Sequence, residues 1–273
     1  MEDGGIIMKK TLKIWMSIIF LLFIFPVVLQ FLPKQSNIPS TLSLKEPSMI
    51  VYASNVLEED IQPKAEGNVL IYSTHTHEAY EPITKAVDGK VAASHHSENI
   101  VKVGGKLKDN LLVNGVTAEQ LDIDIVKIMQ QKKIPYHRSY AAIRPYVEEK
   151  VKSKSYDLVI DLHRDSLGPS RTTITHNNQR YAKVAFVVGR DHPFFEKNLT
   201  KAKQLKSEMD KRVPGITREI IVKGGRGVDG KYNQDLDTSM ILVELGGVGN
   251  NEAELNQTVS IIGESVSALL TVQ

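Results

Sequence analysis

The sequence contains no cysteine. Disulfide bonds and zinc sites built from thiolates are therefore excluded, and a transition metal would have to bind histidine and carboxylate side chains. The chain also lacks an excess of charge of either sign, because 34 Lys and Arg residues oppose 32 Asp and Glu residues and leave a net charge of +2 at pH 7. This balance gives no electrostatic reason to expect nucleic-acid binding, and we predict none.

Three motifs of well-known enzyme classes are absent as well. There is no GxSxG, so the nucleophile elbow of serine hydrolases is not supported, and there is no HExxH, so the metal-binding helix of zincins is not supported. The segment 223–227, KGGRG, is rich in glycine but lacks the spacing of a P-loop. We interpret it as a cationic loop that contacts carboxylates of a peptide.

One long apolar run is present near the N-terminus, at residues 12–32. It has the length of about 20 residues that a membrane-spanning helix requires. Three lysines precede or begin it and one follows it, which places residues 1–11 in the cytoplasm and the rest of the chain outside. A cleaved signal peptide is the alternative, but no small-residue cleavage site follows the run. We therefore expect a single-pass protein of the cell membrane.

The polar segment 33–65 is expected to be a linker, and residues 66–273 to form one catalytic domain. Within this domain, apolar strand-like runs alternate with amphipathic helical ones. The expected strands are 69–73, 116–123, 157–162 and 239–245, with a hairpin in 171–188 that turns at Asn177–Asn178; the expected helices are 97–113, with Ser97 as its N-cap, 140–152, 193–211 and 252–270. This alternation predicts an α/β fold with a mostly parallel twisted sheet and helices on both faces.

Three of the expected strands end in polar residues. The first runs into STHTHE (73–78), the third into HRDS (163–166), and the last into Glu244 and two glycines. In open α/β sheets, ligands bind outside the carboxyl ends of the strands. Each cluster by itself is a weak signal, but together they predict an active site at this edge of the sheet.

The histidines of these clusters suggest a metal site. Catalytic zinc takes three protein ligands and leaves one position for water, and His75 and His163 would supply two imidazoles from strand ends. The candidates for the third ligand are Glu78, Glu98, His96 and His77. Glu78 follows His75 at a spacing that lets one turn present both side chains to a metal, whereas Glu98 would approach from the first turn of a helix. We favour Glu78.

Glu244 is the candidate general base, since a carboxylate must take the proton of the attacking water and pass it to the leaving amine. The alternative is a buried structural carboxylate paired with a cation. Asp165 could accept a hydrogen bond from the imidazole of a metal ligand and so fix the orientation of the ring. Arg164 could bind a substrate carboxylate or pair with Glu244, and an internal salt bridge between Arg164 and Asp165 is the alternative.

Three segments carry a resemblance to a known family: IYSTHTHEAY (71–80), DLVIDLHRDS (157–166) and ILVELGGVGNNEAE (241–254). They resemble the stage II sporulation protein P family of endospore-forming bacteria. The likeness covers roughly residues 66 to 270. By motif, the family's functional histidines match His75 and His163, its acid in the first motif matches Glu78, and the acid after its last strand matches Glu244. Ser73 departs from the pattern, because many members have a histidine there.

This resemblance implies a zinc amidase-like fold and a peptidoglycan hydrolase that acts in septal wall remodelling and engulfment during sporulation. It also implies Zn²⁺ as cofactor, peptidoglycan as substrate, and a complex with a lytic transglycosylase-like protein and a membrane scaffold. We expect cleavage of the N-acetylmuramoyl-L-alanine amide by zinc-activated water. The alternatives are a zinc endopeptidase of peptidoglycan crosslinks and a non-catalytic, membrane-tethered wall-binding module.

Overall fold

The computed structural model describes residues 67–271, and the structural statements below concern that part of the chain. The predicted cytoplasmic N-terminus 1–11, the predicted anchor 12–32 and the predicted linker 33–65 lie outside it. Among the helices within residues 67–271, none combines the length and the apolar character that crossing a bilayer requires.

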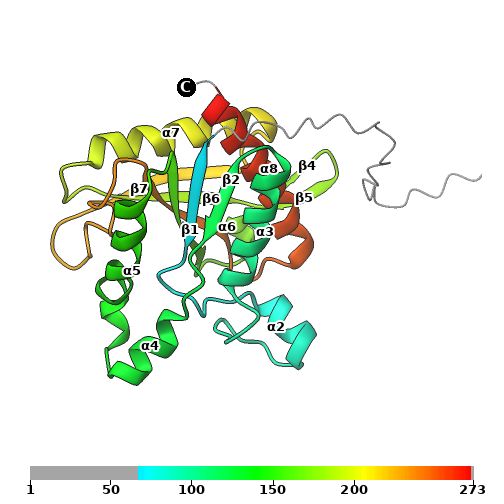
Figure 1. Cartoon of the computed structure of the whole chain (residues 1–273). Coiled ribbons are helices and arrows are strands. Elements are labelled where there is room, and N and C mark those ends of the chain that lie inside the picture. Colours follow the sequence, from blue (N-terminus) through cyan, green and yellow to red (C-terminus); the bar gives the residue numbers. More distant parts are fainter. Residues whose placement is uncertain (1–66, 272–273) are drawn as a thin grey trace, which may run out of the picture. The chain divides into compact units, whose positions relative to one another are not determined.

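A six-stranded sheet forms the centre of the fold (Figure 1). Its strands are β1 (Asn68–Tyr72), β2 (Thr117–Gln120), β3 (Leu158–Asp165), β6 (Val184–Gly189), β7 (Thr217–Lys223) and β8 (Met240–Gly247), in the spatial order β2-β1-β3-β8-β6-β7. Every neighbouring pair is parallel except β6 and β8, which are antiparallel. The prediction of a mostly parallel sheet is therefore confirmed, and β6 and β7 run against the other four strands.

Helices cover both faces of this sheet, as predicted. Successive side chains of a strand point to opposite faces, and in β1 the residues Val69 and Ile71 join the core formed with α3 (Ile100–Val113), α7 (Phe195–Arg212) and α8 (Glu252–Thr271). Leu70 and Tyr72 instead pack with α4 (Ile125–Lys132) and α5 (Ser139–Ser153). In Figure 1, α3 and α8 accordingly lie together on one side of the strands, while α4 and α5 lie on the other.

The predicted hairpin exists, but it is separate from the main sheet. Strands β4 (Thr173–His176) and β5 (Gln179–Ala182) pair with each other in a second, two-stranded sheet. They turn at Asn177 and Asn178, whose φ angles of 48° and 60° lie in the left-handed region that asparagine tolerates and tight hairpins need. The last part of the predicted 171–188 range is β6, which belongs to the central sheet.

Two details of the prediction were wrong. The helix expected from Ser97 begins at Ile100, and its N-cap is Asn99, whose side chain accepts from the backbone N–H of Val101 at 3.0 Å. The backbone N–H of Ser97 is instead held by the ring of His95, so this residue belongs to the preceding loop. The helices α2 (Glu81–Asp88) and α4 and the edge strand β7 were not predicted, because each is short or largely polar.

Candidate metal centre and active site

The polar residues at the ends of β1, β3 and β8 meet in one cavity of about 860 Å³. Parallel strands end at the same edge of a sheet, so the three clusters predicted from the sequence come together there. His75 and Glu78 lie in the loop after β1, His163 and Arg164 near the end of β3, and Glu244 near the end of β8; all five line the cavity.

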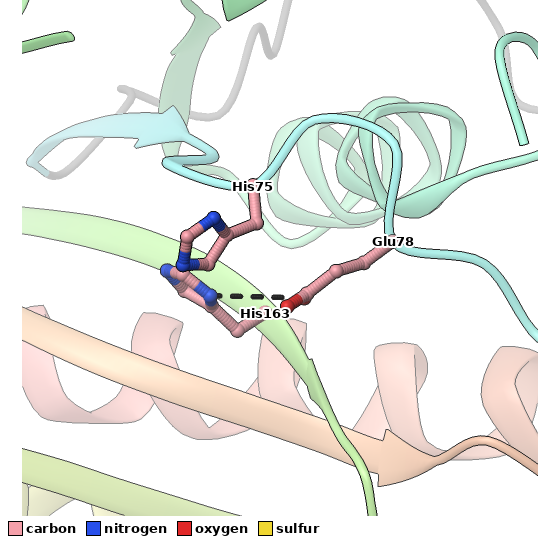
Figure 2. Close-up of side chains that lie close together, drawn as sticks. All are labelled: His75, Glu78 and His163. Atoms are coloured by element: carbon pink, nitrogen blue, oxygen red, sulfur yellow. Dashed lines mark ion pairs between the residues drawn. The ribbon is translucent and has the colours of Figure 1, made fainter. Parts of the chain in front are cut away.

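His75, Glu78 and His163 form a candidate metal site (Figure 2). Each offers one ligand atom, and these atoms all lie within 4.8 Å of one another. Nδ1 of His163 is 3.7 Å from Oε2 of Glu78, the contact that is dashed in Figure 2. Within residues 67–271, no other group of histidine and carboxylate side chains meets this spacing.

The chemistry of the triad fits a divalent metal. Nδ1 of His75 is buried and has no hydrogen-bond partner among the described residues. An unpartnered buried polar atom is costly, so a ligand that would use it is expected. Burial and the nearby His163 both lower the pKa of His75, which favours the neutral imidazole that binds metals. Two imidazoles with one carboxylate are a donor set found in catalytic zinc sites.

Glu78 is held in its ionised form. Burial alone would raise its pKa, but the nearby imidazole of His163 and the hydrogen bond from the backbone N–H of Arg164 outweigh this effect and lower it. That N–H donates to Oε2 of Glu78 at 2.8 Å, so the end of β3 fixes the direction of the carboxylate. Arg164 thus contributes to the site through its backbone.

A carboxylate that the sequence analysis missed lies behind His163. Oδ1 of Asp161 is 2.9 Å from Nε2 of His163. Burial alone would lower the pKa of this imidazole. Asp161 is the main group that outweighs burial, so the pKa of His163 is raised. Asp161 is itself held by Thr74, which donates from its backbone N–H at 2.9 Å and from its hydroxyl at 2.7 Å. Residues two apart on a strand share a face, so Asp161 and Asp165 both qualified by their spacing from His163, and the sequence alone did not single out Asp161.

Asp161 thereby occupies the position beside an imidazole that we predicted for Asp165, and that prediction is corrected. Asp165 pairs with Arg218 of β7 and also accepts from the backbone N–H of Leu167 at 3.0 Å. The guanidinium of Arg164 is not paired with Glu244 or with the Asp165 carboxylate; it donates to the carbonyl oxygens of Ala93 at 2.8 Å and of Asp165 at 3.2 Å.

The other candidates for the third ligand lie outside the triad. The carboxylate of Glu98 is bound by Lys102, with Nζ–Oε distances of 2.9 and 2.7 Å. The ring of His96 stacks on His95 with ring centroids 4.6 Å apart. His77 lines the cavity, but its Nε2 lies 3.0 Å from Asp124. The structure thus places Glu78, and none of these three, beside the two histidines.

We expect Glu78→Gln to lower the affinity for Zn²⁺ by more than about 10-fold, because an amide oxygen is a weaker ligand than a carboxylate. The matched variant Glu98→Gln should keep the wild-type affinity, since Glu98 faces Lys102. Competition with a chromogenic chelator measures both. Loss of zinc in Glu98→Gln, with retention in Glu78→Gln, would make Glu98, which precedes α3, the third ligand instead.

Glu244 lies next to the triad. The register of β3 and β8 pairs it with His163. Its Oε2 is buried and has no hydrogen-bond partner among residues 67–271. Burial raises the pKa of Glu244 to about 7. The charges of Glu78 and Asp165 also raise this pKa, whereas His163 lowers it. An unpaired carboxyl with such a pKa suits proton transfer near neutral pH and differs from the paired structural carboxylate that we considered.

The glycines after Glu244 turn the chain. The register between β3 and β8 shifts here, and Gly246 adopts a φ of 63°, which a side chain would strain. A side chain on Gly247 would collide with the carbonyl oxygen of Leu167. These two glycines thus allow close packing of the protein's own backbone at the end of β8.

The pattern of the family described as Stage II sporulation protein P (SpoIIP) matches residues 34–267. The chain belongs to the stage II sporulation protein P family. Stage II sporulation protein P of Bacillus subtilis (strain 168) is 37% identical over 202 residues, which are 74% of this chain and 50% of that protein. The chain thus spans about half the length of this relative.

Solved structures add little to the assignment to the stage II sporulation protein P family. The CwlD amidase from Clostridioides difficile, solved in complex with the GerS lipoprotein, has a TM-score of 0.47 and 12% identity, covering 76% of this chain and 100% of that one. A metallo-carboxypeptidase from Burkholderia cenocepacia has a TM-score of 0.41 and 11% identity, covering 79% of this chain and 58% of that one. Similarity at this level assigns neither fold nor activity.

Proposed function

We propose that this protein is a zinc-dependent peptidoglycan hydrolase that cleaves the amide between N-acetylmuramic acid and L-alanine. The observation that carries the proposal is that His75, Glu78 and His163 lie with an unpaired Glu244 in one cavity, at the ends of the neighbouring strands β1, β3 and β8. A wall-binding module would have no use for a buried carboxyl without a partner, because such a group costs stability. Membership of the stage II sporulation protein P family supports the same reading.

His75, Glu78 and His163 would hold the zinc ion. Zinc bound there would acidify a water molecule and polarise the substrate carbonyl. Glu244 takes the proton of the attacking water and returns it to the leaving amine; burial, which disfavours its ionised form, raises its pKa in the metal-free protein and makes it a stronger base than an exposed carboxylate. Asp161 keeps the His163 ring in place from behind.

Arg164 would stabilise charge that develops in the substrate. Its side chain is buried and lines the cavity, and its Nε has no partner within the described residues, although its other nitrogens hold backbone carbonyls. A fixed cation with a free N–H is suited to bind an oxygen on which negative charge increases.

For the biological setting, we propose septal wall remodelling and engulfment during sporulation. The enzyme would be held at the cell membrane by a single span at residues 12–32, with its catalytic domain outside the cytoplasm. The support is the family membership and the length of the apolar run. A complex with a lytic transglycosylase-like protein and a membrane scaffold belongs to the same proposal.

The test is digestion of purified peptidoglycan by the full chain, purified in mild detergent, with its zinc content measured in parallel. We expect about one zinc per chain and, by mass spectrometry, free stem peptides that begin with L-alanine. Cut crosslinks with stems still attached to glycan would replace the amidase by an endopeptidase. A chain that binds peptidoglycan but breaks no bond, with or without zinc, would make it a wall-binding module.

A further inference from the structure

A β-bulge in the edge strand β7 lies level with the active site. Val184 of β6 pairs with Thr217 and Phe186 with Ile220, so Arg218 and Glu219 both oppose the single residue Ala185. Ala185 pairs in turn with Glu244 of β8. Bulges occur beside active sites because they redirect side chains, and here both residues of the bulge line the cavity.

Arg218 is the buried member of this bulge. Only 7% of the residue is exposed, and it reaches Asp165 at the end of β3 to form an ion pair. Its Nε is buried and has no partner among residues 67–271. The pair immobilises the guanidinium and leaves the Nε–H group without a hydrogen-bond partner among the described residues. A guanidinium binds carboxylates through several N–H groups in fixed geometry, so this arrangement suits a carboxylate.

Two further cations line the same cavity without forming an ion pair there. Arg171, in α6 (Pro169–Thr172), and Lys223, at the end of β7, are both exposed, and neither has an ion-pair partner within the described part of the chain. Asp165 is already paired with Arg218, and Glu78 belongs to the metal triad. Glu219, the other residue of the bulge, is an exposed acid on the same wall, so the cavity carries charges of both signs, and Arg171 and Lys223 are cations on that wall that internal ion pairs do not occupy.

We infer that the cavity between Glu244 and β7 is a subsite for a carboxylate of the substrate, with Arg218 as the anchor and Arg171 and Lys223 beside it. This inference rests on the proposed function: in peptidoglycan, the stem peptide on the amine side of the scissile bond carries free carboxylates. The peptide would then lie over β6 and β7, with the scissile amide at Glu244. Arg218 is a binding residue that the sequence analysis did not identify.

The test compares two soluble probes, N-acetylmuramoyl-L-alanyl-D-glutamate and the same compound with both glutamate carboxylates converted to amides. Calorimetric binding is measured on the full chain carrying Glu244→Gln, so that binding is read without turnover. We expect the acid to bind roughly 10- to 100-fold more tightly than the diamide, the range for hydrogen bonds to a charged group. Arg218→Gln should remove this preference.

Because Arg218 also holds Asp165, a second pair of variants keeps the test independent of folding. Lys223→Ala and Arg171→Ala remove exposed side chains and should each weaken binding of the acid by up to about fivefold, leaving the diamide unaffected. Lys203→Ala, which removes an exposed lysine of α7 outside the cavity, should change neither probe. In kinetics on the acid, the cavity variants should raise KM more than they lower kcat.

Equal binding of acid and diamide by the wild-type subsite, or the same small effect from Lys203→Ala as from Lys223→Ala, would overturn the inference and leave the proposed hydrolysis intact. If the enzyme cleaves neither the probes nor peptidoglycan, the proposed function is overturned. Calorimetry would still measure, in that case, whether the acid binds more tightly than the diamide.

Discussion

Replacing Glu244 by glutamine is expected to lower the rate of peptidoglycan cleavage by a factor of about 10² to 10⁴, the contribution of a positioned general base, while zinc stays bound. Glutamine keeps the size of the side chain but cannot accept the proton of the attacking water. The three metal-site residues are unchanged, so the affinity for zinc should match the wild type. Product release from peptidoglycan and chelator competition measure the two quantities.

The same variant also separates a catalytic from a structural carboxyl. A raised pKa means that the folded protein disfavours the ionised form, so this carboxyl lowers stability as the pH rises from its unfolded-state value toward about 7. Glu244→Gln removes that penalty, and we expect the metal-free variant at pH 8 to be at least as stable as the metal-free wild type. Clear destabilisation, with cleavage retained, would show that Glu244 serves the fold and is not the base.

The location of the site could be predicted because it depends on local sequence patterns. Buried strands of a parallel sheet are continuous apolar runs, and β3 and β8 both have this form before they reach His163 and Glu244. Once two such strands are assigned to one parallel sheet, their polar ends must share an edge. Which residues of the two strands lie opposite each other depends on the register, and the sequence does not display the register. The pairing of His163 with Glu244 follows from the shared edge and the register together.

The rest of the site depends on pairing between distant segments. The bulge that aims Arg218 and Glu219 into the cavity exists only because β7 lies beside β6, and TREIIVK carries no signal for that partner. The choice of Asp161 over Asp165 behind His163 depends on which acid finds a cation elsewhere: Arg218 reaches Asp165. In the same way, Lys102 one turn along α3 holds Glu98 away from the metal site.

His163→Gln is expected to abolish stoichiometric zinc binding and, with it, cleavage of peptidoglycan. His163 is the buried centre of the triad: it lies beside Glu78, contacts the ring of His75 with centroids 5.1 Å apart, and pairs in register with Glu244. Glutamine fills much of the same volume, so the fold should survive while an imidazole ligand is lost. Zinc content after dialysis and the zinc-dependent rise in Tm measure the effect, since an ion that binds only the folded protein stabilises it.

His77→Gln is the matched control, because His77 lines the same cavity but pairs with Asp124. It should keep the zinc content and the rise in Tm of the wild type. If His77→Gln lost zinc and His163→Gln kept it, His163 would not be a ligand of the metal. The mechanism that places Glu244 beside the metal through its pairing with His163 would then fail together with the site.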